Sequence, residues 1–252
     1  MVLSLDVPPI SNVTRWPSLF GHGLFAVNKV VLLEWLAAVL VFGLFWAAAR
    51  RRSLVPTGVQ NAGEALMEFV QNEIILQAMG PEGMSWTPFL MTLFTFIFVC
   101  NIFEVVPVIQ MPVTARIALP MFLALIVFVS YHVVGVRRNG VLGYLKASMV
   151  PPGVPKGILP LVALNLFVEF IFTKPFSLGV RLFANLLAGH LLLVTFSVLT
   201  AALFSATYIG AVVPGALLVA LYAFEVLVSV LQAFIFTMLT AVYLGGAMHP
   251  QH

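Results

Sequence analysis

Five apolar stretches dominate the pattern of hydrophobic and polar positions along the chain. The first three are Val30–Ala49, Trp86–Ile109 and Ile117–Val136, and each is about as long as the roughly 20 residues that a helix needs to cross the hydrocarbon core of a bilayer. The last two, Ile158–Thr207 and Val212–Leu244, are considerably longer. The pattern predicts an all-α multi-pass membrane protein.

A shorter segment, residues 58–80, has an amphipathic pattern instead. Its apolar positions recur at helical spacing, at Ala62, Leu66, Phe69 and Val70. The other side of this predicted helix is acidic and carries Gln60, Glu64, Glu68 and Gln71. Helices that bind the membrane surface usually present Lys and Arg there. We therefore expect a helix at the cytoplasmic surface, and the acidic face favours packing against a partner protein over lipid binding alone.

The last two stretches are too long for upright membrane helices. Fifty residues from Ile158 to Thr207 would extend about 75 Å as one helix, against about 30 Å of hydrocarbon. One solution is a break at Pro160 or Pro175, because proline interrupts the helical hydrogen bonds. The other is a pair of strongly tilted helices, which contact with a large curved neighbour would favour.

Composition excludes the soluble alternatives. Hydrophobic residues make up 62% of the chain and charged residues 8%, whereas a soluble domain is about 25% charged. The single cysteine, Cys100, excludes a disulfide framework and a thiol metal site. Basic residues are too few and too scattered for nucleic-acid binding. We expect no cofactor and no metal.

The positions of Lys and Arg predict the orientation. One set of loops holds seven basic residues, namely Arg50, Arg51, Arg52, Arg137, Arg138, Lys146 and Lys156. The opposite set holds three, Arg15, Lys29 and Arg116. Because basic loops stay in the cytoplasm, we expect the N-terminus outside and the C-terminus in the cytoplasm.

The chain is therefore predicted to consist of six segments. They are an N-terminal outer segment (1–28), a transmembrane helix (29–52), the amphipathic cytoplasmic-surface helix (58–80), a transmembrane hairpin (86–136), a cytoplasmic loop (137–157) and a long tilted helical hairpin (158–248).

Polar residues inside the two long stretches are the functional candidates. The first stretch contains Glu169, Lys174, Ser177, Arg181, Asn185 and His190, and the second contains Tyr222, Glu225, Ser229 and Gln232. A charge at mid-bilayer costs about 3 kcal/mol on insertion scales. Residues of this kind are retained for function by default.

Residue numbers predict how the two long stretches pair. In an antiparallel hairpin, residues at one depth have a roughly constant sum of residue numbers. Three polar pairs have sums near 414, namely Arg181 with Gln232, Asn185 with Ser229, and His190 with Glu225, which places the turn near residue 207. Arg181 and His190 are half a turn out of phase on a straight helix. They are thus expected to belong to two differently directed polar sites.

Small residues surround Arg181 on its predicted face. Ser177, Ala184 and Ala188 share this face, so another helix can approach closely. The guanidinium would then meet a group on that helix, and a carboxylate fits best.

Four motifs resemble subunit a of the F-type ATP synthase, the stator of its membrane motor. They are Lys-Pro-Phe-Ser-Leu-Gly-Val (174–180), Arg-Leu-Phe-Ala-Asn-Leu-Leu-Ala-Gly-His (181–190), Leu-Gln-Ala-Phe-Ile-Phe-Thr-Met-Leu-Thr-Ala-Val-Tyr-Leu (231–244) and Asn-Ile-Phe-Glu-Val-Val-Pro (101–107). The last of them ends a span with an acidic residue, Glu104, and a proline. The similarity covers most of residues 55–248 and little of the first 28.

This resemblance implies a non-enzymatic subunit of the cell inner membrane with two offset aqueous half-channels beside a rotating ring of c subunits. It also implies b-type subunits of the peripheral stalk and, indirectly, the F1 sector as partners. Arg181 would face the ring carboxylate. Asn185, His190, Glu225 and Gln232 would belong to the path from outside, and Ser177 and Lys174 to the cytoplasmic path.

The resemblance includes one difference from many bacterial relatives. Those carry an acid where His190 stands and a histidine where Glu225 stands, whereas the mitochondrial-type pattern has the order found here. The exchange keeps one acid and one base at the same depth, which supports a paired role and favours protons over sodium.

Several alternatives remain open from sequence. Lys174 and Glu169 could simply extend their charges to the interface, and Glu34 and Glu104 could line a vestibule or end a solvated helix. A proton-coupled secondary transporter is the main rival, although no repeated halves are visible. An intramembrane enzyme is disfavoured, because the chain has neither a His-Glu-x-x-His nor a Gly-x-Ser-x-Gly motif.

Overall fold

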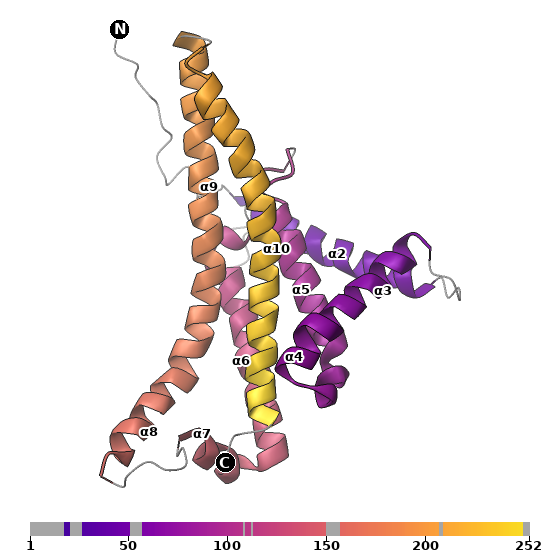
Figure 1. The fold of residues 1–252 in the computed structure, drawn as a ribbon, viewed down its shortest axis with the longest axis vertical. Helices are drawn as coiled ribbons and strands as arrows, with labels where there is room; N and C mark the ends of the chain where they lie inside the picture. The colour runs from indigo at the N-terminus through magenta and orange to yellow at the C-terminus, as the bar shows by residue number, and fades with distance from the viewer. Residues whose placement is uncertain are drawn as a thin grey trace.

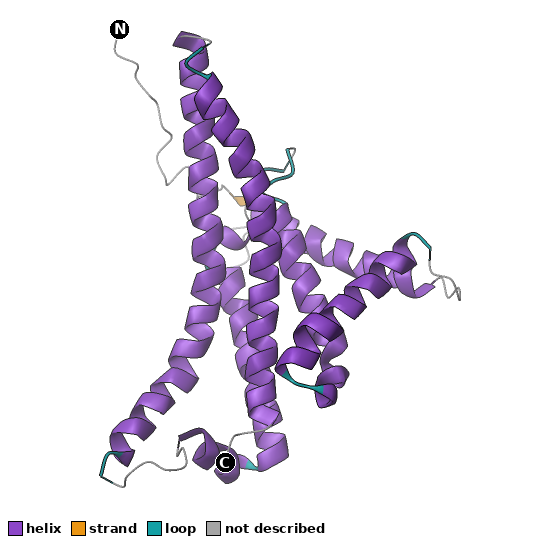
Figure 2. Ribbon diagram, viewed as in Figure 1, coloured by secondary structure: helices purple, strands orange, loops and turns teal. Residues whose placement is uncertain are grey.

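The computed structural model describes residues 18–20, 27–50, 57–107, 109–111, 113–149, 157–206 and 209–248. These residues form the nearly all-helical molecule of Figure 2. Its only described strands are β1 (Ser18–Phe20) and β2 (Val27–Asn28), which pair antiparallel. Five described helical segments are long and apolar enough to cross a membrane, namely Lys29–Arg50, Pro81–Ile102, Ala118–Asn139, Pro160–Phe204 and Val212–Met248. The predicted all-α multi-pass class is confirmed.

The N-terminal half contains the shorter helices. They are α2 (Lys29–Arg50), α3 (Val59–Phe69), the π-helical turn η2 (Val70–Ile75), α4 (Leu76–Ala78), the 3-10 helix η3 (Pro81–Trp86) and α5 (Thr87–Ile102). After the 3-10 turn η4 (Val113–Ala115) come α6 (Ala118–Asn139) and α7 (Val141–Met149).

The C-terminal half contains the two longest helices. α8 (Leu159–Val168), the π-helical turn η5 (Glu169–Thr173) and α9 (Lys174–Ala206) run on without interruption, and α10 (Val212–Met248) returns beside α9. The turn lies between Ala206 and Val212, as the residue-number sums predicted. Figure 1 shows α9 and α10 side by side along the long axis, with α8 and the first turns of α9 swinging away from α10.

The two prolines proposed as break points have different roles. Pro160 occupies the first turn of α8, where its missing N–H costs nothing. Pro175 follows η5, so the helix absorbs this proline through a wider turn instead of breaking. Of the two alternatives left open by the sequence, a break at Pro175 is therefore not observed, and the continuous helix bends there instead.

The second membrane helix ends earlier than its apolar stretch. Helix α5 stops at Ile102, and residues 103–106 form turns. Pro107 explains the position, because a proline disfavours the helical conformation at the residue before it. Glu104 therefore lies beyond the end of α5 and not within the helix.

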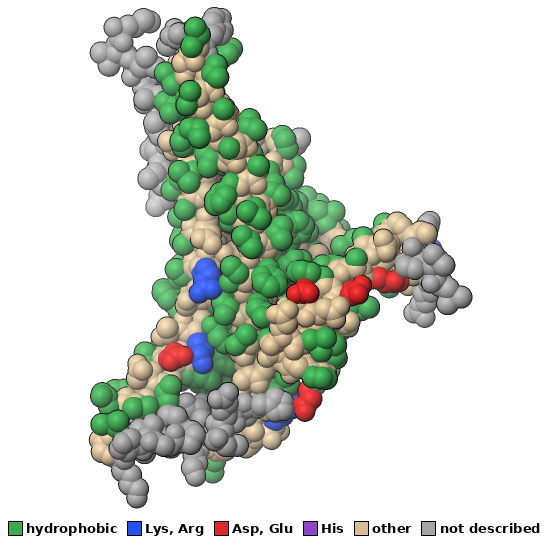
Figure 3. All heavy atoms as spheres, in the orientation of Figure 1, with side chains coloured by type: hydrophobic (Ala, Val, Ile, Leu, Met, Phe, Trp, Pro, Cys, Tyr) green, Lys and Arg blue, Asp and Glu red, His purple; other side chains and the backbone are tan. Residues whose placement is uncertain are grey.

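The amphipathic segment packs differently from its predicted faces. Gln60, assigned to the polar face, is 8% exposed, whereas Ala62 is exposed. A Cβ added at Gly63 would lie 2.8 Å from the Cβ of Ala48. Close packing of α3 on α2 at Gly63 thus turns Gln60 inward. The two acidic side chains of α3, Glu64 and Glu68, are exposed. Figure 3 shows acidic side chains on the surface of this part of the molecule.

The core lies where α5, α6 and α10 meet. Its buried side chains include Leu90, Ile97, Val127, Phe236 and Leu244. A smaller cluster joins α2 to the end of α5 and contains Cys100, which is buried and packs there. Most of the remaining surface in Figure 3 is hydrophobic, as expected for a chain whose solvent is lipid. Helices α9 and α10 pack on this core and position the site.

Candidate functional site

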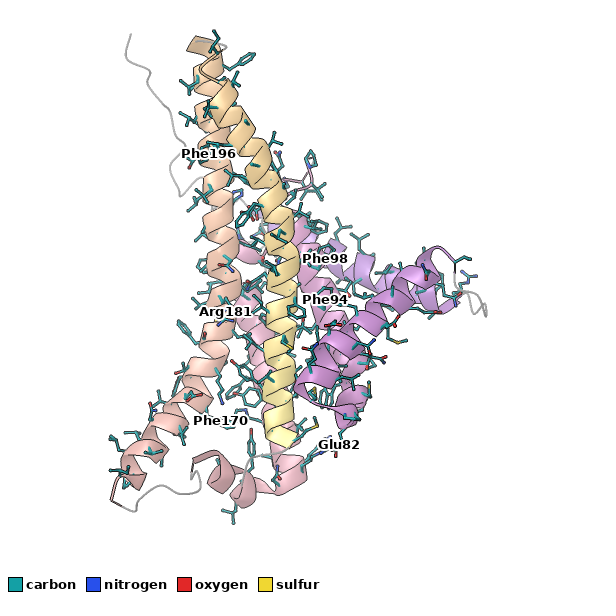
Figure 4. The ribbon with its side chains drawn as sticks, viewed as in Figure 1. Glu82, Phe94, Phe98, Phe170, Arg181 and Phe196 are labelled. Carbon is teal, nitrogen blue, oxygen red and sulfur yellow. The ribbon has the colours of Figure 1, made fainter. Side chains whose placement is uncertain are left out.

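Helix α9 presents two opposite faces. Leu178, Leu182, Leu186 and Leu193 are buried, whereas Ser177, Arg181, Ala184, Asn185 and Ala188 are exposed. The i, i+4 spacing places each set on one side. Arg181 lies about two turns from the start of α9 (Figure 4) and forms no ion pair with any described carboxylate. The helix therefore offers a small-residue surface that carries one unpaired cation.

Asn185 connects this face to α10. Its side-chain Nδ2 donates a hydrogen bond to Oε1 of Gln232 at 2.8 Å. The sequence predicted Asn185 opposite Ser229 and Arg181 opposite Gln232, and that pairing is wrong for Asn185. The reason is that helix side chains lean toward their own N-terminus. In an antiparallel pair Asn185 and Gln232 lean toward each other, so they meet although their backbones are offset.

Glu225 lies against the backbone of α9. The side chain is 2% exposed, and its carboxylate faces Gly189, where any added Cβ would overlap it. The numbers of these two residues sum to the predicted 414. Gly189 was missed as a site residue, although a glycine beside His190 in a close helix pair was a usable signal.

His190 is paired with Glu104. Its Nδ1 lies 3.3 Å from Oε1 of Glu104, whereas no described contact joins it directly to Glu225. Glu104 is 2% exposed. Burial raises the pKa of the Glu104 carboxyl above its usual value, and the contact with His190 lowers it in part. The predicted His190–Glu225 pair is therefore corrected to a group of three, with Glu104 as the histidine's partner.

A cavity of about 210 Å³ opens beside this group. The polar part of its lining consists of Glu104, Gln110, His190, Ser197 and Tyr222. Nε2 of Gln110 donates to the Tyr222 hydroxyl at 3.1 Å. Gln110 has a φ of 40°, which a residue other than glycine seldom adopts and which is found at functional sites. Sequence gave no signal for Gln110, since it stands in a loop between two apolar stretches.

Unpaired polar atoms continue from the cavity along α10. Among the described side chains, Oε2 of Glu104, Oε2 of Glu225, Oγ of Ser229 and Nε2 of Gln232 are buried without a hydrogen-bond partner. Buried polar groups are almost always hydrogen-bonded, to protein or to ordered water. Ser229 and Gln232 are 0% and 1% exposed. This row of groups is suited to holding a file of water molecules that ends at Asn185.

Asn101 and Thr114 tie the loop of Glu104 to α10. The Thr114 hydroxyl donates to Oδ1 of Asn101 at 2.8 Å, and Nδ2 of Asn101 reaches the Ser229 carbonyl at 3.5 Å. Both side chains are fully buried. Asn101 was noted in a motif but was given no role, and Thr114 was missed, because their contact depends on how the loop folds back.

A second polar group lies on the other side of Arg181 along α9. Nζ of Lys174 lies 3.7 Å from Oε1 of Glu169. The ammonium also lies over the rings of Phe170 and Tyr243, at 5.5 and 5.7 Å from their centres. Ser177 is exposed between this group and Arg181. The predicted site residues thus form two groups at different depths, with Arg181 between them.

No group of three or more His, Cys, Asp or Glu suited to a metal ion occurs in the part of the chain that the structure describes. The chemistry available is that of carboxylates, one imidazole, amides, hydroxyls, one ammonium and one guanidinium.

Comparison with known proteins identifies the family. The family model described as ATP synthase A chain matches residues 31–245. An ATP synthase subunit a of Parafrankia sp. (strain EAN1pec) is 40% identical over 226 residues, which cover 89% of this chain and 77% of that protein. Those of Frankia alni and Maricaulis maris are 38% and 39% identical, and cover 97% and 92% of this chain and 87% and 92% of their own lengths. The chain therefore belongs to the ATP synthase subunit a family.

Proposed function

We propose that this chain is the proton-translocating stator subunit of an F-type ATP synthase. It provides two offset half-channels and an arginine, Arg181, that exchanges with a carboxylate of the rotor ring. The observation that supports this most directly is the row of buried, unpaired polar atoms from the cavity at Glu104 to Gln232. Buried polar atoms without hydrogen-bond partners destabilise a fold unless water molecules occupy the row and bond to them.

The outer path begins at the cavity. The excess of basic residues in the opposite loops favours an outward-facing cavity, with the N-terminus outside and the C-terminus in the cytoplasm. Glu104, His190 and Glu225 can each bind and release a proton. Ser229, Gln232 and Asn185 orient water but carry no charge.

Arg181 separates the two paths. Its guanidinium stays protonated at any physiological pH, so it attracts an ionised ring carboxylate but does not relay a proton. A carboxylate that takes a proton from the outer path becomes neutral and can leave Arg181 for lipid at little cost. One that arrives from the lipid on the other side must first lose its proton toward Ser177, Lys174 and Glu169.

The partners follow from this mechanism. The exposed small-residue face around Arg181 contacts the c-subunit ring, while b-type subunits of the peripheral stalk bind elsewhere and the F1 sector is reached indirectly. The chain itself performs no catalysis, and it resides in the cell inner membrane as a multi-pass subunit.

Glu225→Gln tests the proposal, with Glu68→Gln on the exposed face of α3 as the matched control. Glutamine keeps the shape of the side chain but holds no exchangeable charge. We expect proton flux through assembled complexes to fall by about 10²-fold, the scale of a lost acid–base group, while the control stays at the wild-type rate. Equal flux in Glu225→Gln and wild type would overturn this assignment of the outer path.

A further inference from the structure

The bend between α8 and α9 leaves one backbone carbonyl without a helical donor. Within η5 the N–H of Lys174 donates to the carbonyl of Glu169, five residues back. In an α-helix that N–H would instead serve Phe170. The next possible donor to Phe170, five residues on, is residue 175, and this is a proline with no N–H. The widened turn and Pro175 together therefore deprive Phe170 of both helical donors.

A tyrosine from another helix satisfies this carbonyl. The hydroxyl of Tyr131, on α6, donates to the Phe170 carbonyl at 2.9 Å. Tyr131 is 1% exposed. A buried carbonyl without a partner is strongly disfavoured. The hydroxyl thus stabilises the π-helical form of η5 over other arrangements of the same residues.

Aromatic rings fix the Phe170 side chain on the same side. The ring centres of Tyr131, His132 and Tyr144 lie 5.6, 4.6 and 5.4 Å from that of Phe170. Figure 4 shows Phe170 on the inner side of the bent helix, toward the body of the molecule. Helices α6 and α7 therefore hold the bend from one side.

Next to these rings, the turn is incompletely packed against α6. An apolar hollow of about 350 Å³ lies between α6 and the bend, lined in part by Phe128, Phe172, Pro175 and Phe176. Phe172 and Phe176 are 63% and 57% exposed. The hollow leaves room for η5 to rearrange. The direction of α8 therefore depends on the contacts that Phe170 makes.

We propose that Tyr131 is a positioning residue that holds the bend at η5 and so sets the gap between α8 and α10. The inference rests on the proposed function, in which Glu169, Lys174 and Ser177 belong to the cytoplasmic path. These residues lie on or next to η5, where the bent helix diverges from α10 (Figure 1). Holding the bend keeps that path open to water.

Tyr131→Phe removes only the hydroxyl, and Tyr144→Phe is its matched control. Tyr144 belongs to the same aromatic group and is 2% exposed, but its hydroxyl has no hydrogen-bond partner among the described residues. Spin labels at Leu161 on α8 and Val242 on α10, both exposed, report the gap in the assembled complex. The background carries Cys100→Ala, which removes the chain's only cysteine.

We expect Tyr131→Phe to broaden the distance distribution, with the population of the native bend reduced by about fivefold to tenfold relative to other forms. The rate at which an impermeant thiol reagent labels Ser177→Cys from the cytoplasmic side should fall in parallel, because the path is then less open to water. Tyr144→Phe should leave both unchanged. Equal behaviour of the two phenylalanine variants would overturn the proposal.

Pro175→Ala separates the hydroxyl's role from general packing. Alanine restores an N–H at position 175, which can serve Phe170 within the widened turn. Tyr131→Phe should therefore have little effect in the Pro175→Ala background, and the two changes should be non-additive. An equal effect in both backgrounds, or failure of both Tyr131→Phe chains to assemble, would show that the hydroxyl does not act by satisfying the Phe170 carbonyl and would overturn the proposal.

The distance measurement requires no proton transport. If Glu225→Gln left proton flux unchanged, the proposed function would fail while the role of Tyr131 in the bend would still be decided by the spin labels.

Discussion

Gly189 on α9 lies directly against the Glu225 carboxylate of α10, and replacing it by alanine should displace Glu225. An added Cβ would lie 2.6 Å from Cδ and 2.7 Å from Oε2 of the Glu225 carboxylate. Carbon atoms prefer separations of about 3.5–4.0 Å. The carboxylate must therefore move by about 1 Å from its position beside Glu104 and His190.

Gly189→Ala should lower proton transport and should leave folding largely unchanged. Alanine in a helix interior is favoured over glycine by about 1 kcal/mol. Overpacking costs about 1–3 kcal/mol, and here the overlapping atoms are at the mobile end of a side chain. The two effects largely cancel, so the chain should fold and assemble. A reacting group misplaced by about 1 Å can lose about 10²-fold in rate.

The assay is proton flux through assembled complexes in vesicles, normalised to the amount of this chain in the membrane. Gly246→Ala is the matched control, because it is a helical glycine of α10 with nothing within 4 Å of an added Cβ. We expect a reduction of between about tenfold and 10²-fold for Gly189→Ala and none for Gly246→Ala.

A second change tests the cause. Glu225→Asp shortens the side chain by one methylene and withdraws the carboxylate from position 189. In the Gly189→Ala background it should recover part of the lost flux, although alone it should lower it. Wild-type flux in Gly189→Ala, or no recovery in the double variant, would refute the reasoning that the glycine is there to admit the carboxylate.

Two further predictions concern the loop after α5. Thr114→Val should lower the stability of the assembled subunit by about 1–3 kcal/mol, since it leaves Oδ1 of Asn101 buried without its donor, whereas Thr114→Ser should not; equal unfolding midpoints would contradict this. Burial raises the pKa of Glu104, so this carboxyl ionises at a higher pH than an exposed glutamate. Glu104→Gln should remove that titration from the pH profile of outward-side proton uptake, and an unchanged profile would exclude Glu104 from the path.

Much of the fold could be read from the sequence because lipid imposes a simple rule. Every backbone polar group in the bilayer must be satisfied within its own segment, so long apolar runs become helices. The five spans and the turn after Ala206 follow from this rule. The exposed face of α9 that carries Arg181 could be predicted from helical periodicity. Ser177, Ala184 and Ala188 lie three, four or seven residues from Arg181 and therefore share its face.

Contacts between segments could not be read in the same way. The pairing of His190 with Glu104 depends on α5 ending at Ile102 and on the loop folding back through Asn101 and Thr114. The pairing of Asn185 with Gln232 depends on the lean of side chains across an antiparallel pair, which a sum of residue numbers ignores.

The sequence by itself determined which residues had to leave the lipid and on which helix face each stood, because hydrophobicity and helical period act locally. The tertiary structure decided which of these polar groups meet. It also decided between the two alternatives for the long stretch, because the helix bends at η5 before Pro175, where the Tyr131 hydroxyl donates to the Phe170 carbonyl. The physical reason is that a buried polar atom is satisfied by whichever partner packing brings within about 3 Å, and that distance is set by helices far apart in the chain.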